Sequence, residues 1–263
     1  MRKPVNIVVL LVLVFVVALT GCGPKDTGGG TEPVATDTPE SLVPIPTPIP
    51  PTAIDRTIRL DPAIVNDNDS LTVSTYIYDC LTRLDINGEP QPGLALQWTP
   101  SDDQLDYVVT LRRGVKFTNG ADFNADIVLA NFNRWFDPTN SLHGTATYTG
   151  WQNYFLGFLG EVDANNLPIS FYDGIEKVDA YTVLIHLNRP EPNLFAILAN
   201  PYFAMLDTQM LAAKGDAYGT SADTVSGTGA YEILSWNDSG LVLTPSPIFW
   251  GNLPTENLQF SWK

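Results

Sequence analysis

The stretch VTLRRGVKFTNGADFNADIVLANFNRWFDP, Val109–Pro138, places strand signals directly before a helix signal. Two apolar runs flank Arg112 to Gly114, which predicts a hairpin-like reversal of the chain. The side chain of Asn124 is of a type that caps helices, and Asp137-Pro138 is a dipeptide that ends them. We therefore expect a helix over Asn124–Phe136, preceded by a strand pair.

Strand and helix signals alternate on both sides of this stretch. The segment DNDSLTVSTYIYDCLTRLD, residues 67–85, is typical of a helix capped by Asp69 or Ser70. Residues 141–160 are rich in Gly, Thr and aromatic residues and are expected to form a loop. A strand is expected over residues 178–188, followed by a short helix that begins near Pro192. This interleaving of strands and helices favours an α/β or α+β fold.

The composition limits the classes of function. The chain has 263 residues, of which 44% are hydrophobic, enough for the core of one large domain or two ordinary ones. Its formal net charge is −15. Because a nucleic-acid backbone requires a basic surface, we expect no nucleic-acid partner.

The N-terminus is typical of an exported protein. Arg2 and Lys3 precede an unbroken apolar run, Ile7–Leu19. This run is shorter than the roughly 20 residues that span a membrane, but it suits the apolar region of a signal peptide. It ends in LTGC, residues 19–22, which resembles a bacterial lipobox. An ordinary secretory signal peptide with a chance cysteine is the alternative.

These features divide the N-terminal part into two segments. We expect a lipoprotein signal peptide over residues 1–21, lipid attached to Cys22, and a Pro/Gly-rich tether over residues 22–54. The prediction is an extracytoplasmic protein whose lipid anchors it to the membrane.

The segment SGTGAYEILSW, Ser226–Trp236, raises the question of phosphate binding. A dinucleotide fingerprint needs a third glycine where this chain has Glu232, and it opens a helix, whereas a strand pattern follows here. The GK[ST] sequence of a Walker loop does not occur in the chain. We therefore interpret Gly227 and Gly229 as turn residues that supply backbone dihedral angles, and we expect no nucleotide cofactor.

Other catalytic and metal-binding patterns are weak. His143 and His186 are far apart and lack metal-ligand spacing, and the G-x-S-x-G motif is absent. The acidic pair Asp102-Asp103 falls in an expected turn. Cys80 lies among apolar neighbours and is expected to be a buried small hydrophobe. We expect no enzymatic activity, no cofactor and no metal, with a surface lipoprotein hydrolase as the alternative.

Several motifs, taken in order, carry a resemblance to a known family. The chain resembles the family 5 extracellular solute-binding proteins, which are the peptide/nickel-type receptors of ABC importers. The resemblance covers Leu60–Phe260. Its motifs are PGLALQW (residues 92–98), the stretch Val109–Pro138, VDAYTVLIHLNRPEPNLFAIL (178–198), SGTGAYEILSW (226–236) and FWGNLPTENLQF (249–260).

The resemblance implies an α/β fold, that of lobe I of a type II periplasmic binding protein. Lobe I is then expected over residues 55–263, with a main subdomain of about 55–120 and 225–263 and a smaller subdomain of about 121–224 inserted into it. Members of the family carry a full strand before the leucine-aspartate-proline segment, and they are longer than this chain. We therefore expect the first strand to be shortened or lost and the second lobe to be missing.

The resemblance also implies a function. Family members capture a solute, here expected to be an oligopeptide, by closure of two lobes and deliver it to an ABC permease. In relatives the region after the helix at Asn124–Phe136 approaches the ligand, so Tyr148 and Trp151 are expected to stack on it. The alternative is that both rings pack in the core. Tyr202 and Thr228 are further candidates. The departures from the family leave open a degenerate scaffold or sensor without transport.

Overall fold

The computed structural model describes residues 52–263, which belong to one compact unit. The predicted signal peptide and Cys22 lie outside the described residues. None of the helices within residues 52–263 is both long enough and apolar enough to cross a bilayer.

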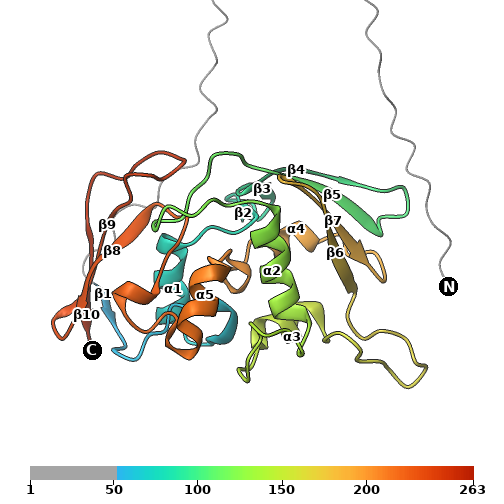
Figure 1. Ribbon diagram of the computed structural model, residues 1–263, viewed down its shortest axis with the longest axis horizontal. Helices are drawn as coiled ribbons and strands as arrows, with labels where there is room; N and C mark the ends of the chain where they lie inside the picture. Colours follow the sequence, from blue (N-terminus) through green and yellow to red (C-terminus); the bar gives the residue numbers. More distant parts are fainter. Residues whose placement is uncertain (1–51) are drawn as a thin grey trace, which may run out of the picture. The chain divides into compact units, whose positions relative to one another are not determined.

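The first sheet joins the start and the end of the described chain (Figure 1). Its strand order is β1-β10-β9-β8, in which β1 runs parallel to β10 and the other neighbours are antiparallel. The first strand is therefore not lost, since Thr52–Ile54 pair with β10. Ile54 is 1% exposed and belongs to this sheet. The tether predicted over residues 22–54 therefore ends too late, because its last three residues are part of β1. The strands are β1 (Thr52–Ile54), β8 (Tyr231–Asn237), β9 (Gly240–Pro245) and β10 (Leu258–Trp262).

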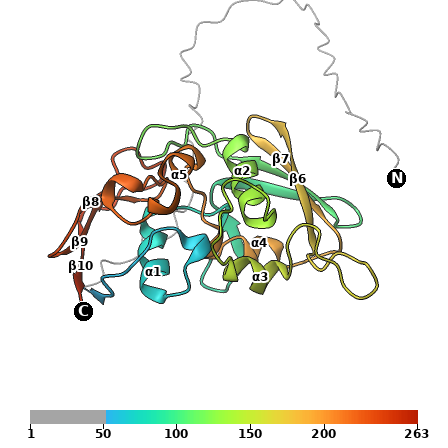
Figure 2. The ribbon, with the colours of Figure 1, turned by 60° about the horizontal axis from the view of Figure 1, so that its bottom comes forward.

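Helix α1 (Asn68–Ile77) lies beside the first sheet (Figure 2). Its cap is Asp67, whose carboxylate accepts a hydrogen bond from Ser70 N at 2.7 Å. The prediction of Asp69 or Ser70 as the cap is therefore wrong, since the local sequence offers several capping side chains in a row. The first core contains the buried apolar face of α1 and the inner faces of the strands. It comprises Ile54, Ile58, Leu60, Val73, Tyr76, Ile77, Tyr78, Ala204, Leu206, Leu211, Tyr218, Tyr231, Leu241, Leu243, Leu258 and Phe260.

The second sheet has the order β4-β5-β7-β6 and is antiparallel throughout. The predicted reversal at residues 112–114 is wrong, because β5 pairs with β4 and β7, while Lys116 forms an isolated bridge to Asp122. The single strand expected over residues 178–188 is the end of β6 and the whole of β7, separated by a turn. The strands are β4 (Ala95–Pro100), β5 (Asp106–Leu111), β6 (Tyr172–Asp179) and β7 (Thr182–Leu187).

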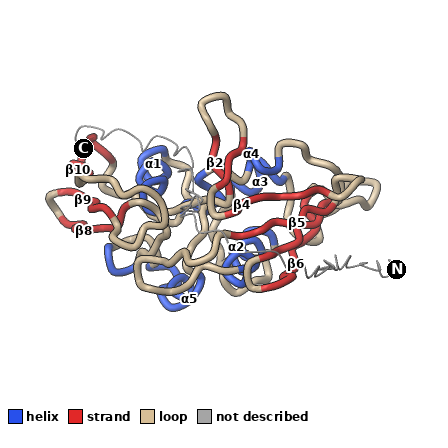
Figure 3. Tube along the Cα trace, turned by 90° about the horizontal axis from the view of Figure 1, so that it is seen from above, coloured by secondary structure: helices blue, strands red, loops and turns tan. Residues whose placement is uncertain are grey.

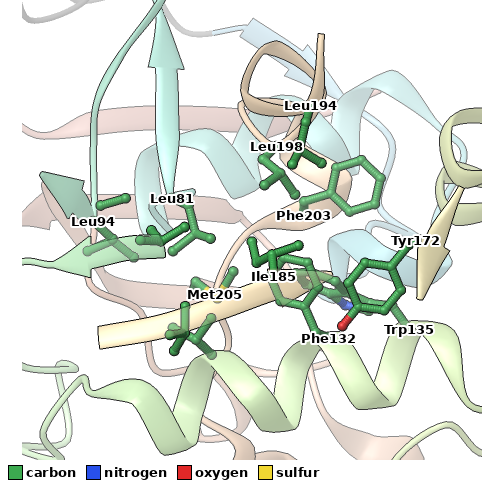
Figure 4. Packing of buried hydrophobic residues seen from close by; sticks show 14 of the residues in the cluster. Leu81, Leu94, Phe132, Trp135, Tyr172, Ile185, Leu194, Leu198, Phe203 and Met205 are labelled. Carbon is green, nitrogen blue, oxygen red and sulfur yellow. The ribbon is translucent and has the colours of Figure 1, made fainter. Parts of the chain in front are cut away.

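Helix α2 (Ala125–Phe136) packs against the second sheet. The Asn124 side chain accepts hydrogen bonds from the N–H groups of Asp126 and Ile127, and Asp137 ends the helix. The predicted helix is thus confirmed with its cap. Its buried residues Phe132 and Trp135 meet Tyr172 and Ile185 of the sheet in a second core rich in aromatic rings (Figure 4).

Shorter elements lie between the two sheets, which Figure 3 shows on opposite sides of the folded residues 52–263. Part of the predicted loop over residues 141–160 forms a helix, α3, and the helix expected near Pro192 is confirmed as α4. The elements are β2 (Thr82–Leu84), β3 (Pro90–Pro92), α3 (Thr149–Phe155), α4 (Leu194–Ile197) and α5 (Thr208–Lys214). The 3₁₀ turns are η1 (Pro62–Ile64), η2 (Pro201–Phe203), η3 (Gly215–Ala217) and η4 (Ala222–Thr224).

The subdomain boundary expected between residues 120 and 121 does not follow the sheets. Strands β4 and β5, assigned to the main subdomain, belong to the second sheet. Conversely, Ala204, Leu206 and Leu211, assigned to the smaller subdomain, pack in the first core. Sheet pairing between residues distant in sequence therefore decides the division, and the order of motifs along the chain does not.

Candidate ligand-binding surface

Two tyrosines are partly exposed where α3 and η2 meet. Tyr154 of α3 is 37% exposed, Tyr202 of η2 is half-buried, and their ring centroids are 6.5 Å apart. The amide Nδ2 of Asn200 donates a hydrogen bond to the Tyr154 hydroxyl at 2.9 Å. We call Tyr154, Asn200 and Tyr202 the tyrosine surface. It presents ring faces and hydrogen-bonding groups together.

Local packing fixes the tyrosine surface. A Cβ at Gly150 of α3 would lie 2.3 Å from Cγ of Tyr202, so the absence of a side chain lets this ring lie against the helix. The Asn200 side-chain oxygen accepts a hydrogen bond from Tyr202 N at 3.2 Å and so caps η2. The Asn200 carbonyl lies 3.4 Å from Sγ of Cys80.

Cys80 is half-buried, less enclosed than expected. Burial raises the pKa of its thiol, and neighbouring Asp79 adds to the increase. The thiol is therefore a poor nucleophile, in line with a packing role.

The two aromatic residues predicted to stack on a ligand are buried instead. Tyr148 and Trp151 are each 1% exposed. The Tyr148 hydroxyl donates to the carbonyl of His143 at 2.9 Å, and the Trp151 indole stacks on Phe155 at 4.1 Å. Their prediction as ligand contacts is wrong for this structure, because both rings fill the second core.

Tyr154 is not among the predicted contacts, because residues 141–160 were expected to form a loop. With α3 recognised as a helix, Tyr148, Trp151 and Phe155 recur at i, i+3 and i+7, which is the spacing of a buried stripe. This spacing in the sequence indicates that the three rings are buried, and it places Tyr154 at the edge of the buried stripe.

Thr228, another predicted contact, is 2% exposed and committed to an internal partner. Its hydroxyl donates to the Asp79 carboxylate at 3.1 Å, and Nε1 of Trp250 donates to the same oxygen at 2.8 Å. Burial raises the pKa of Asp79, while Arg83 and the two hydrogen bonds oppose this increase. Thr228 therefore anchors the chain rather than facing a ligand.

Gly227 and Gly229 are needed for a reason different from the one predicted. Neither has a φ angle in the left-handed region. A Cβ on Gly227 would instead lie 1.9 Å from the carbonyl oxygen of Ile77, and one on Gly229 would lie 2.6 Å from the Ile77 carbonyl carbon. Gly229 N donates to that same Ile77 oxygen at 2.9 Å. The glycines allow two backbone segments to touch.

A buried ion pair links the two cores. Arg134 of α2 donates to both carboxylate oxygens of Asp61, at 3.1 and 2.5 Å, and both side chains are at most 3% exposed. Arg134 Nε also donates to the carbonyl of Leu142 at 3.1 Å. A buried ion pair is tolerated when its charged groups are also hydrogen-bonded, as they are here. The role of Arg134 and Asp61 is therefore structural.

Two open hollows are found among residues 52–263. One, of about 240 Å³, lies beside α1 and the start of β8, and the other, of about 270 Å³, lies along β8, β9 and β10. Both volumes are below the roughly 300–1,000 Å³ of a typical ligand pocket. The first hollow is lined by Ile77, Thr118, Asn119, Met210, Ala222, Asp223, Val225, Glu232 and Ile233.

The family description "Bacterial extracellular solute-binding proteins, family 5 Middle" matches residues 89–259. This chain belongs to that family. The glutathione-binding protein GsiB of Salmonella choleraesuis is 37% identical to it over 183 residues, which are 70% of this chain and 31% of GsiB. GsiB of Escherichia coli O157:H7 is 34% identical over 183 residues. The chain thus spans about a third of the length of these family members.

Solved structures show the same fold. The periplasmic binding protein DppA of Helicobacter pylori, in complex with the peptide STSA, has a TM-score of 0.66 and 25% identity. HbpA2 of Haemophilus parasuis has a TM-score of 0.66 and 29% identity. The aligned regions cover 81% of this chain and 41% and 42% of the two proteins, respectively. The α/β fold of type II periplasmic binding proteins is confirmed, and the chain is similar to solute-binding proteins of ABC transporters.

Proposed function

We propose that this protein captures a short peptide or peptide-like solute outside the cytoplasm, without converting it, and delivers it to an ABC permease. The observation that carries the proposal is the 37% identity to a protein named for glutathione binding. The relative DppA, at 25% identity, was solved with the peptide STSA. Glutathione and STSA are both short chains of amide-linked amino acids. A receptor for either must recognise amides, an ammonium group and carboxylates.

The tyrosine surface offers groups suited to such a solute. Exposed tyrosine rings provide apolar contact area at a low cost in conformational entropy, and their hydroxyl groups donate or accept hydrogen bonds. Tyr154 and Asn200 already hold each other in place through a 2.9 Å hydrogen bond, so little ordering remains to be done on binding. Tyr202 is held by the contact with Gly150.

Calorimetric titration of the full chain with reduced glutathione and with short peptides tests this proposal. We expect saturable binding and an unchanged ligand by mass spectrometry afterwards. Tyr154→Ala should weaken binding about ten-fold, which corresponds to about 1.4 kcal/mol. Tyr181→Ala, which removes a half-buried tyrosine from the turn between β6 and β7, is the matched control and should bind normally. A turned-over ligand would instead favour the hydrolase alternative, and equal losses in both variants would exclude the tyrosine surface.

We further propose that Cys22 carries lipid. The support is the apolar run ending in LTGC, residues 19–22. The wild-type protein should then be recovered with the membrane fraction and Cys22→Ser should be released from it. Equal membrane recovery of the two proteins would contradict the anchor without affecting the solute-binding proposal.

A further inference from the structure

Three side chains from three neighbouring strands meet on the outer face of the second sheet. Asp106 of β5 is directly opposite His186 of β7, and Glu176 of β6 is opposite Leu184, two residues from His186. The distance from His186 Nδ1 to Asp106 Oδ1 is 2.6 Å, and that from His186 Nε2 to Glu176 Oε1 is 3.8 Å. The imidazole therefore lies between two carboxylates that are 80 and 10 residues away in the sequence.

The two ring nitrogens have different surroundings. A carboxylate only accepts hydrogen bonds, so the short contact to Asp106 places the proton of a neutral imidazole on Nδ1. Nε2 then carries the lone pair. Among the described residues Nε2 has no hydrogen-bond partner, although it is shielded from solvent. A shielded acceptor without a donor is unfavourable, so the site is suited to a group that accepts the lone pair.

Nε2 is covered in the present conformation, so an ion can reach it only if a neighbouring side chain moves. The residue directly opposite His186 on β6 is Gly174, and a Cβ built there has no atom within 4 Å. The Glu176 side chain is 72% exposed, so it can rotate towards this space. The Glu176 carboxylate, whose Oε1 lies 3.8 Å from Nε2, is an anionic group on this side of the ring.

The contact between Nδ1 and Asp106 is of a kind also found around metal-binding histidines. Imidazoles that bind metal through one nitrogen almost always donate the other N–H to a carboxylate or carbonyl, which fixes the tautomer and the ring orientation. An ion with nitrogen and oxygen ligands at about 2.1 Å in tetrahedral geometry holds those ligands about 3.4 Å apart. Glu176 would have to move by only a few tenths of an ångström from its 3.8 Å distance.

We propose that His186 Nε2 and the Glu176 carboxylate bind a divalent transition-metal ion such as Zn²⁺, with Asp106 as the positioning residue. Imidazole and carboxylate together suit Zn²⁺ and its neighbours better than Mg²⁺ or Ca²⁺. No three His, Cys, Asp or Glu side chains within residues 52–263 are placed to surround one ion. The site therefore has two protein ligands completed by water, and it is weaker than a closed structural zinc site. It is separate from the tyrosine surface and does not depend on the proposed solute.

The test is calorimetric titration of Zn²⁺ into the chelator-treated full chain at pH 7.5. We expect one saturable site that His186→Gln and Glu176→Gln each weaken at least ten-fold. Glu256→Gln, which removes an exposed carboxylate outside the three strands, is the matched control and should bind as the wild type does. All three site residues lie on an outer sheet face, so the variants should melt at the wild-type temperature. Undiminished binding by His186→Gln would place the ion elsewhere and overturn the proposal.

Imidazole ¹⁵N NMR gives a second test that needs no variant. The chain contains two histidines, and His143 is buried with its Nδ1 2.7 Å from the Arg134 carbonyl, so it serves as an internal reference. Zn²⁺ should shift the Nε2 resonance of His186 and leave that of His143 unchanged. Asp106→Asn should change the tautomer population of His186 and weaken Zn²⁺ binding about 10- to 100-fold. A metal-free spectrum in which both His186 nitrogens are protonated at pH 7.5 would show an ion pair with the carboxylates and refute the site.

Discussion

Replacing Gly227 by alanine tests why this chain needs glycines in Ser226–Ala230, here called the glycine loop. The new Cβ would lie 1.9 Å from the carbonyl oxygen of Ile77, where real Cβ contacts are longer than 3.0 Å, so one of the two backbone segments must move by about 1 Å. The neighbouring hydrogen bond from Gly229 N to Ile77 O, at 2.9 Å, shares this oxygen and would be stretched. Thr118 N, which donates to the Gly227 carbonyl at 2.9 Å, would also be displaced.

The magnitude follows from these contacts. Overpacking costs about 1–3 kcal/mol, and a lost hydrogen bond adds about 0.5–1.5 kcal/mol. The lower chain entropy of alanine in the unfolded state offsets about 0.4–1 kcal/mol. We therefore expect Gly227→Ala to lower the free energy of unfolding by about 2 kcal/mol. For a domain of this size, that corresponds to a fall in Tm of about 4–8 °C.

The assay is urea and thermal unfolding followed by circular dichroism, with Gly174→Ala as the matched control. Gly174 also has no left-handed φ, and a Cβ there meets no atom within 4 Å, so its replacement should change stability by less than about 0.5 kcal/mol. Equal effects of the two substitutions would show that close approach to Ile77 is not the reason for Gly227. A nucleotide-dependent rise in the wild-type Tm would revive the phosphate-binding interpretation.

Three further outcomes are expected. Gly229→Ala, whose Cβ would lie 2.6 Å from the Ile77 carbonyl carbon, should also destabilise, by less than Gly227→Ala does in the same urea titration. Asp61→Asn leaves the buried Arg134 unpaired and should lower the free energy of unfolding by about 3–5 kcal/mol. The double variant Asp61→Leu/Arg134→Met should recover most of that loss, and no recovery would contradict the structural role of the pair. Burial lowers the pKa of His143, so the unfolded state binds more protons, and stability should fall as pH drops from about 6.5 towards 5. This pH dependence should shrink in His143→Phe and persist in His186→Gln, and the opposite pattern in urea unfolding would assign it to His186.

Parts of the fold could be predicted from the sequence because their causes are local. The helix at Asn124–Phe136 has its cap and its stop within its own segment, and the structure confirms both. The strand after the glycine loop is β8, as its apolar run predicts. The order of the motifs identified the family, which the match over residues 89–259 confirms.

What the sequence did not reveal depends on contacts between distant segments. The partners of β5 come from residues 95–100 and 182–187, so a local reversal signal at residues 112–114 misled the prediction. Gly227 looked like a source of unusual dihedral angles, but its role is set by a carbonyl 150 residues earlier.

The candidate sites follow the same division. The sequence determined that aromatic residues gather near residue 150, because composition is visible in any window. Only the tertiary structure decided that Tyr148 and Trp151 face the core while Tyr154 meets Asn200 and Tyr202 at the surface. Likewise His186 lacks metal-ligand spacing in the sequence, since its neighbours Asp106 and Glu176 are brought to it by the register of three strands. The sequence gives the identity of each side chain. The exposure of that side chain and its contacts depend on how strands pair and helices pack between segments that are distant in the sequence.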